Sequence, residues 1–127
     1  MIFGIGTDIV SYKRMHALHE RYGARLAQRL LHEAEVPGYQ ASSDPARYRT
    51  KRFAAKEAFA KALGTGFRLH VGLRRIHISH DTQGKPLLGF DAELFDYVAS
   101  LGVTRHHLSI SDERDVAVAF VVLERGD

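Results

Sequence analysis

Two glycines on one face of an expected β-strand constrain the fold of this chain more than any other feature. Residues 2–9 alternate with the period of a strand, which places Gly4, Gly6 and Asp8 on one face. The opposite face is apolar and carries Phe3, Ile5 and Ile9. Because glycine has no side chain, another backbone can approach the first face closely, and Asp8 ends that face.

A helix predicted over residues 46–63 provides a suitable surface to pack there, because it is rich in alanine. Gly64 is a natural helix stop, and residues 64–66 form a tight turn after it. Glu57 and Lys61 are four residues apart, so they are neighbours on one helix face with alanines beside them. Packing this face on the glycines would bring Asp8 near Glu57.

Two interpretations of these charged residues are open. Carboxylates of Asp8 and Glu57 at a dry interface would repel unless a cation separated them, and Mg²⁺ prefers such oxygen ligands together with phosphate oxygens. Lys61 would then suit a phosphate bound to the same ion. The simpler alternative is a surface ion pair between Glu57 and Lys61, with Asp8 as a helix cap, and spacing alone favours it.

The remaining pattern predicts an α+β fold in a single domain, residues 1–127, with a mostly antiparallel sheet and helices packed on one side. The last strand is apolar on both faces, so we expect it in the middle of the sheet. The other expected elements are a helix over 12–31 broken near Gly23, a loop over 37–45, a hairpin of strands 74–80 and 86–90, a helix over 92–101 capped by Asp91 and stopped by Gly102, and a hairpin of strands 107–111 and 116–124.

The cations are concentrated in two segments. The chain has 18 lysines and arginines against 15 acidic residues, yet residues 11–30 alone carry a net +4 and residues 45–61 a net +5. This distribution favours an anionic partner at a defined patch. Helical spacing places four of the early cations on one exposed ridge: Arg14, Arg21, Arg25 and Arg29.

Several classes of function are excluded or disfavoured. The absence of cysteine excludes disulfides, zinc–thiolate sites and thiol catalysis. No apolar run approaches the ~20 residues that span a bilayer. Asp8 comes too early for a signal peptide, and no positive residue precedes it, so we expect a soluble, cytoplasmic protein. No Walker loop, dinucleotide fingerprint or hydrolase nucleophile elbow is present.

The eight histidines do not predict a shared metal site, because neighbouring ones point to opposite faces of their strands. This holds for His77 with His80 and for His106 with His107. His107 shares its face with Ser109 and Ser111. That polar stripe either lines a pocket or is a solvated sheet face, and the pattern alone favours the second.

Four motifs resemble those of a known family. They are residues 4–10 (Gly-Ile-Gly-Thr-Asp-Ile-Val), 52–58 with 61–66, 84–86 (Gly-Lys-Pro) and 107–111 (His-Leu-Ser-Ile-Ser). Their order and spacing are similar to those of holo-(acyl-carrier-protein) synthase, the small bacterial type of 4′-phosphopantetheinyl transferase. The resemblance runs from Met1 to about Glu124, and its first two motifs together are highly specific.

The resemblance implies a 4′-phosphopantetheinyl transferase fold and a magnesium-dependent reaction. The family transfers 4′-phosphopantetheine from coenzyme A to a serine of apo acyl carrier protein, for fatty acid biosynthesis, and releases adenosine 3′,5′-bisphosphate. The small type is a homotrimer with active sites at the subunit interfaces. Coenzyme A and acyl carrier protein are therefore the expected partners, with no nucleic acid and no membrane.

Roles follow by position. Asp8 and Glu57 match the family's Mg²⁺ ligands, where Mn²⁺ could substitute, and Lys61 matches the lysine that meets the coenzyme phosphates. Arg52 and His107 match positions near the nucleotide, His107 from the neighbouring subunit. The loops that wrap the coenzyme match Gly64, Gly66, Gly84 and Pro86. The helix that docks the acidic carrier matches Arg14, Arg21 and Arg25, with Arg29 added only by periodicity.

Some points stay open at this level. Glu57, directly or through a metal-bound water, is the candidate base, with Asp8 as the alternative. Asp112 stands where many family members have a histidine, and the segment 65–70 also differs in detail. Two other functions compete: a related transferase that serves carrier domains of polyketide or peptide synthetases, and a non-catalytic module that binds RNA or another polyanion. Few aromatics lie among the cations, which disfavours the polyanion module.

Overall fold

The computed structural model of the protein describes residues 1–68 and 70–126, so Leu69, in the segment noted above, and Asp127 lie outside the described residues. The elements in chain order are β1 (Ile2–Ser11), α1 (Tyr12–Tyr22), α2 (Arg25–Leu30), the 3₁₀ turn η1 (Glu33–Glu35), α3 (Val36–Ala41), α4 (Pro45–Leu63), the 3₁₀ turn η2 (Leu73–Arg75), β2 (Ile76–His80), β3 (Pro86–Phe90), α5 (Ala92–Ser100), β4 (Val103–Asp112) and β5 (Val116–Arg125).

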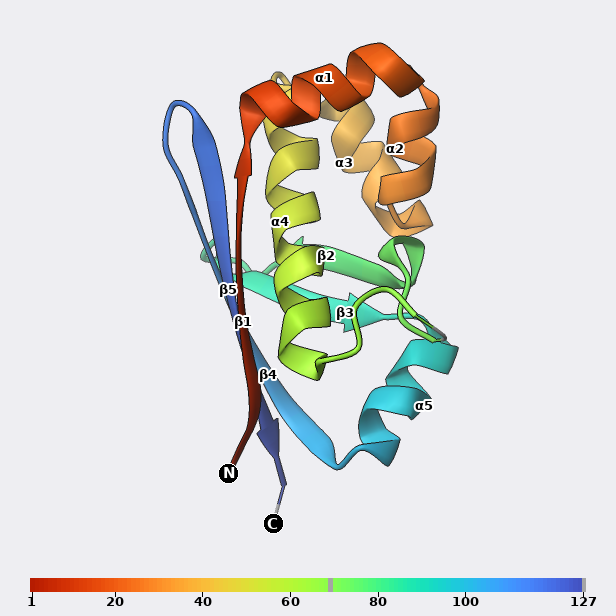
Figure 1. The fold of residues 1–127 in the computed structure, drawn as a ribbon, viewed down its shortest axis with the longest axis vertical. Coiled ribbons are helices and arrows are strands. Elements are labelled where there is room, and N and C mark those ends of the chain that lie inside the picture. Colours follow the sequence, from red (N-terminus) through yellow and green to blue (C-terminus); the bar gives the residue numbers. More distant parts are fainter. Residues whose placement is uncertain (69, 127) are drawn as a thin grey trace.

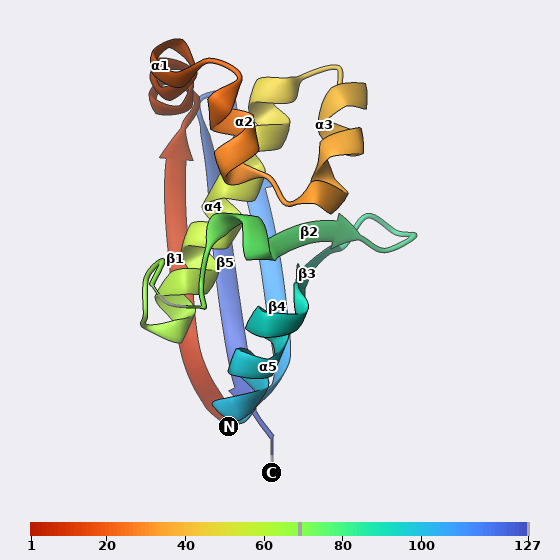
Figure 2. The same ribbon diagram turned by 90° about the vertical axis from the view of Figure 1, so that its right-hand side faces the viewer.

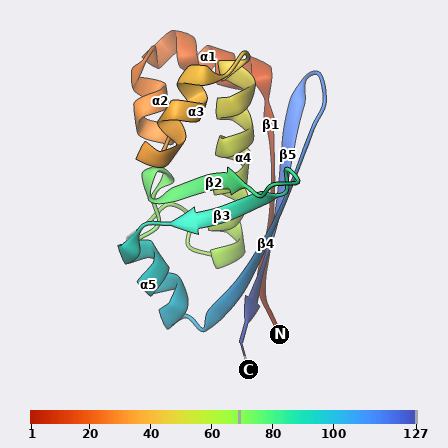
Figure 3. The same cartoon turned by 180° about the vertical axis from the view of Figure 1, so that it is seen from behind.

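The strands form two antiparallel sheets, which confirms the α+β class. The larger sheet has the order β1-β5-β4, with the expected central place for β5, and β2 pairs with β3 in a separate hairpin. All the helices lie on one side of the larger sheet (Figure 1). The β2–β3 hairpin lies between the group α2 and α3 at one end and α5 at the other (Figures 2 and 3).

The close contact expected between the first strand and the alanine-rich helix is present. A Cβ built on Gly4 would lie 2.0 Å from the carbonyl oxygen of Ala62, and one on Gly6 would lie 2.0 Å from that of Ala58. Both distances are impossible for real atoms, so only glycine allows this separation of β1 and α4. The helix backbone therefore lies directly on the strand that carries Asp8.

Helix α4 is the centre of the fold, and its ends follow from local chemistry. The Asp44 side chain accepts a hydrogen bond from the backbone N–H of Arg47, and Pro45 follows in the first turn, where a donor is not needed. Gly64 ends the helix in the left-handed conformation, φ +81°. Most of the helix is buried, with Phe59 fully enclosed.

Several boundaries differ from the sequence-based expectation. Residues 37–41 of the expected loop lie in α3, because proline in the first turn of a helix leaves no hydrogen bond unmade. Strand β1 continues to Ser11, α4 already begins at Pro45, and α5 ends at Ser100. The expected strand 74–80 begins only at Ile76, after the turn η2. The final hairpin, in contrast, is longer than expected, since β4 extends to both sides of its predicted range and β5 continues one residue beyond its own.

The expected break near Gly23 divides the basic ridge. Gly23 has φ +59°, and the chain changes direction between α1 and α2 (Figure 1). The basic ridge is therefore divided into two short exposed stretches on two helices. A single line of arginines would require the helix to continue unbroken through Gly23. Arg14 and Arg21 lie on α1, and Arg25 and Arg29 lie on α2.

The face of the larger sheet that points away from the helices is open and carries exposed apolar side chains. Ile5 is 59% exposed, Ile9 62% and Phe120 44%. We call the side of the sheet that packs on α4 the inner face and this apolar side the outer face. Among the described residues, no helix is long and apolar enough to cross a membrane.

Candidate active site

The first strand and the central helix bring Asp8 and Lys61 together. Lys61 Nζ lies 3.1 Å from Asp8 Oδ1 and donates to the carbonyl oxygen of Thr7 at 3.0 Å. Lys61 thus forms its ion pair across two elements and not along its own helix. The capping alternative for Asp8 is wrong, because the Oγ of Ser11 accepts the N–H of Arg14 and caps α1.

Glu57 lies close enough to Asp8 for their charges to interact. Burial raises the pKa of Glu57, and the negative charge of Asp8 raises it further. The positive charges of Arg14 and Lys61 act in the opposite direction. The two carboxylates therefore share one half-buried site, with Arg14 of α1 at its border.

The donor set at this site fits a hard divalent cation. Asp8 Oδ2 is buried and has no hydrogen-bond partner, which is costly for a carboxylate oxygen unless a cation binds it. Glu57 supplies the second carboxylate. The residues that the structure describes contain no group of three or more histidine and acidic side chains arranged for a metal. The remaining ligands would therefore be water or substrate oxygens, the usual pattern for Mg²⁺.

A second feature is a cationic cleft of about 200 Å³ beside the first half of α4. Arg52, expected near a nucleotide, lines it, and Lys51 and Arg47 contribute further positive charge. Arg52 and Glu57 are five residues apart, so they lie about 140° apart around the helix. Cleft and carboxylates thus occupy different sides of α4. Arg47 and Lys51 were missed from the sequence, where only their contribution to the net charge was visible.

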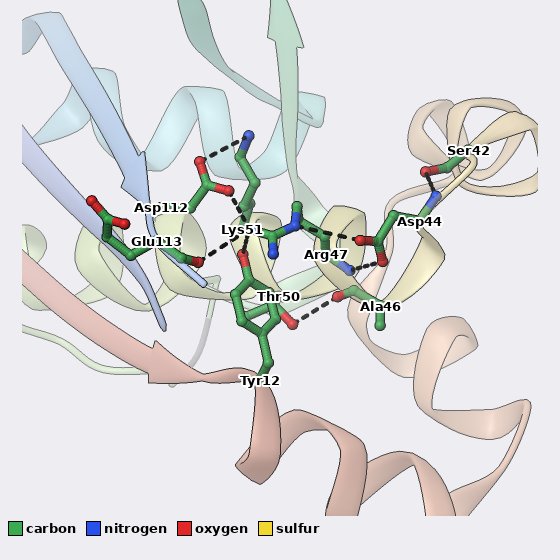
Figure 4. A network of polar contacts seen from close by, with 9 residues as sticks. All are labelled: Tyr12, Ser42, Asp44, Ala46, Arg47, Thr50, Lys51, Asp112 and Glu113. Atoms are coloured by element: carbon green, nitrogen blue, oxygen red, sulfur yellow. Dashed lines mark hydrogen bonds and ion pairs between the residues drawn. The ribbon is translucent and has the colours of Figure 1, made fainter. Parts of the chain in front are cut away.

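Two residues that line the cleft, Arg47 and Lys51, also take part in a polar network (Figure 4). Arg47 Nη1 donates to Asp112 Oδ2, to the Tyr12 hydroxyl at 2.8 Å and to the Glu113 carbonyl oxygen at 3.2 Å. Lys51 Nζ lies 3.7 Å from Asp112 Oδ1. The hydrogen bond from Arg47 holds the pKa of Asp112 below its usual range. Asp112, the residue that departs from the family pattern, therefore ties the tip of the β4–β5 hairpin to α4.

The turns expected to wrap a ligand carry glycines with positive φ angles. Gly64 and Gly66 have φ +81° and +63°, directly after Lys61 on the chain. Gly84 has φ +87° in the turn before Pro86. His80 pairs with Pro86 in that hairpin, and burial together with the charges of Arg52 and Lys51 lowers the pKa of His80. This end of the hairpin therefore lies beside the cationic cleft.

His107 does not join the other predicted site residues within one chain. It lies on the outer face, paired with Val122 of β5, and its Nε2 is 3.1 Å from Glu124 Oε2. Ser109 and Ser111 are exposed on the same face. His106 points the other way and meets Phe90 edge-on, with ring centroids 5.2 Å apart.

Comparison with known proteins places the chain in a family. The model of the 4′-phosphopantetheinyl transferase superfamily matches residues 4–121. The chain belongs to this superfamily. As a member of the superfamily, the chain is an enzyme. The similar proteins described next are all transferases of one type within it.

The chain is 55% identical to the holo-(acyl-carrier-protein) synthase of Nitrosospira multiformis, over 98% of this chain and all of that one. The crystal structure of the synthase from Neisseria meningitidis superposes with a TM-score of 0.97 at 47% identity, over 98% of this chain and 100% of that one. The synthase of Bacillus anthracis in complex with CoA (3′,5′-ADP) has a TM-score of 0.81 at 34% identity, with 99% of each chain covered.

Proposed function

We propose that this 4′-phosphopantetheinyl transferase is a holo-(acyl-carrier-protein) synthase. It transfers 4′-phosphopantetheine from coenzyme A to a serine of apo acyl carrier protein and releases adenosine 3′,5′-bisphosphate. The whole chain acts as one domain, in the cytoplasm, in the service of fatty acid biosynthesis. The observation that carries the proposal is the convergence of Asp8, Glu57 and Lys61 in a chain similar to these synthases over its full length.

Asp8 and Glu57 would hold a Mg²⁺ ion, or Mn²⁺ in its place. When bound there with the diphosphate of coenzyme A, the ion neutralises charge that develops on the leaving phosphate. The unsatisfied Oδ2 of Asp8 supports this assignment.

Lys61 binds the diphosphate with a fixed positive charge. Its Nζ is already beside Asp8, and its side chain is exposed enough to meet a ligand at the same place. The charge would lie where the diphosphate bond of coenzyme A breaks, so it would stabilise the transition state more than the bound substrate. Arg52 meets the nucleotide end of the coenzyme in the cationic cleft.

Glu57 is the base that takes the proton of the carrier serine. The charge of Arg14 acts on Glu57, which places this carboxylate beside helix α1, where we expect the carrier to dock. Asp8 is the less suitable base, because one of its oxygens is held by Lys61. The serine, deprotonated by Glu57, attacks the phosphorus that bears pantetheine.

The exposed arginines Arg14, Arg21 and Arg25 bind the acidic carrier. Contacts between arginine and carboxylate groups speed the encounter and fix its orientation. Arg25→Glu, on α2, should therefore raise the KM for the carrier at low salt and leave coenzyme A binding unchanged. Arg14→Glu should raise the carrier KM as well, although its charge also acts on Glu57. An unchanged carrier KM would contradict this docking site.

The enzyme works as a homotrimer, in which each active site receives residues from two chains. The outer face exposes Ile5, Ile9 and Phe120, a patch that a second copy would cover. His107 lies on that face and would reach the nucleotide bound by the neighbouring subunit. Within each chain, the turns proposed to wrap the coenzyme carry Gly64, Gly66, Gly84 and Pro86.

The test is mass spectrometry of apo acyl carrier protein incubated with the enzyme, coenzyme A and magnesium. We expect the wild type to add the mass of one phosphopantetheine group. Asp8→Ala, Glu57→Ala and an EDTA-treated wild type should each lose the product.

A folded wild type that modifies no carrier would overturn the proposal. A panel of carriers separates the fatty acid carrier from carrier domains of polyketide or peptide synthetases. Binding of RNA that weakens steeply with salt and needs no magnesium would instead indicate a polyanion-binding module.

A further inference from the structure

A buried cluster of charges lies next to the cationic cleft and has no part in the proposed reaction. Glu35 is 2% exposed and Lys56 is fully enclosed. Lys56 Nζ donates to Glu35 Oε1 and to the carbonyl oxygen of Leu30. The backbone N–H groups of His32 and Ile78 donate to the two oxygens of Glu35, each at 2.9 Å. One carboxylate therefore connects α4, η1 and β2.

The same carboxylate also reaches Arg52. Arg52 Nε lies 3.4 Å from Glu35 Oε2, an ion pair without a well-formed hydrogen bond. The guanidinium carbon of Arg52 lies 3.4 Å from the ring centroid of Tyr48. The Tyr48 hydroxyl in turn donates to the carbonyl oxygen of Glu35 at 2.7 Å. Arg52 is thus held from two sides by groups that Glu35 joins.

The cluster carries an excess positive charge on the side of the cleft. Glu35 is one anion between two cations, Lys56 and Arg52, so the cluster keeps one positive charge in excess. Lys56 is sealed in the interior, whereas Arg52 lines the cleft together with Arg47 and Lys51. An anion in the cleft would therefore complete the balance, and Arg52 is the group that would meet it.

Burial alone would not require these charges. Well-packed apolar side chains of similar volume often replace a buried ion pair without loss of stability, so an ion pair kept here calls for another role. A guanidinium that must meet a ligand in one orientation gains from a fixed carboxylate and a stacked ring.

We propose that Glu35 is a positioning residue for substrate binding: together with Tyr48 it fixes the guanidinium of Arg52 at the wall of the cleft, where Arg52 binds the anionic nucleotide end of coenzyme A. The inference rests on the proposed function, because it takes coenzyme A as the ligand. Glu35 touches neither substrate nor the reacting atoms and acts through Arg52.

The test is a mutant cycle that separates positioning from stability. The double variant Glu35→Gln with Lys56→Met removes both charges of the pair and keeps the approximate shape of the side chains, so the fold is expected to persist. We expect the KM for coenzyme A to rise about tenfold, since Arg52 loses its charged partner, while kcat stays within about twofold. Arg52→Met alone should give a similar rise.

The decisive result is non-additivity. If Glu35 acts through Arg52, the pair replacement has no further effect on the coenzyme KM once Arg52→Met is present. Independent, additive effects in the triple variant would overturn the proposal. Tyr48→Leu provides a second cycle with Arg52→Met if the buried pair cannot be replaced, and Tyr48→Phe, which keeps the ring, should cost less.

Arg49→Met is the matched control for a loss of buried charge. Arg49 is 4% exposed on the same helix, but its Nη1 contacts the Tyr39 hydroxyl and His19, away from Glu35. The Arg49→Met variant should have a lower melting temperature than the wild type and an unchanged KM for coenzyme A. A rise as large as that of the Glu35 variant would mean that the KM only reports stability, and would overturn the positioning role.

Calorimetric titration with coenzyme A distinguishes this inference from the proposed function. A wild type that binds the coenzyme but modifies no carrier would contradict the proposed function and leave the cycle measurable through Kd. If the wild type is fully active but the Glu35 and Arg52 replacements have additive effects on the coenzyme KM, only the role of Glu35 is contradicted.

Discussion

The two faces of the larger sheet are built from alternate residues of the same strands, yet they are opposites. On the inner face, Gly4 and Gly6 let α4 come so close that an added Cβ would lie 2.0 Å from its backbone oxygens. On the outer face, Ile5 and Ile9 are 59% and 62% exposed. One face is defined by missing side chains and the other by apolar side chains that the single chain leaves uncovered.

This difference indicates that the two faces have different roles, one in folding and one in assembly. The inner face is complete within one chain, and it holds Asp8 against Lys61 of α4. The outer face carries His107 on the opposite side of the sheet, and in the proposed trimer further copies would cover it. A change at the close contact between the glycines and α4 should therefore affect folding, whereas a change on the outer face should affect assembly.

The largest effect is expected from Gly6→Val. Its side chain would overlap the carbonyl oxygen of Ala58 and force β1 away from α4, at a cost of about 3 kcal/mol or more. Denaturant unfolding measures the loss, and Ile5→Val, on the opposite face of the same strand, is the control. A Gly6→Val protein as stable as the control would contradict the close packing of this face.

The next effect separates catalysis from stability within the inner face. Asp8→Asn should reduce the transfer rate by about 100-fold or more, because it removes one of the two carboxylates that would hold the Mg²⁺ ion. Stability should be unchanged or slightly higher, since the unpaired carboxylate oxygen and its repulsion with Glu57 are removed. Initial rates and melting curves check both halves, and a clearly lower melting temperature would assign Asp8 a structural role instead.

An outer-face variant should have an intermediate effect. Ile9→Glu places charges on the uncovered patch, so we expect monomers in light scattering and at least about a tenfold loss of activity. The monomer should stay folded, because Ile9 contributes little to the inner packing. Ser100→Glu, at an exposed position of α5, is the charge control, and a fully active Ile9→Glu monomer would refute a site shared between subunits.

The smallest effect concerns the hairpin that joins the outer face to α4. The pKa of Asp112 is lowered by Arg47, so the pair stabilises the fold above the ordinary pKa and loses this contribution as the pH falls through the lowered one. Asp112→Asn should melt about 2 °C lower at neutral pH and show a flatter acid limb. Melting curves between neutral pH and about pH 2 test this, and identical pH profiles would contradict it.

Local patterns predicted much of the fold and of the carboxylate site. The bare face of β1, the alanine-rich helix and the central place of β5 follow from periodicity and side-chain size, which act between near neighbours. The cluster around Glu35 and Lys56 could not be found in this way. Charged residues are expected at the surface, and only the packing of α4 against η1 and β2 buries these two together.

The direction of the basic ridge shows a second limit. Helical spacing gave the right exposed arginines, but a single residue, Gly23, turned the chain and separated them into two helices. A backbone angle at one glycine has no periodic signal, so the pattern could predict the break but not the new direction.

The pairing of β1 with β5 determines when the enzyme can fold during its synthesis. Asp8 faces Ala119, so the first strand made on the ribosome finds its neighbour in the sheet only when nearly all of these residues have been synthesised. Until then the nascent chain carries an unpaired apolar strand, and such non-local pairing slows folding. Asp8 therefore reaches its place in the sheet only late, and a truncated translation product that lacks β5 should be inactive and prone to aggregate.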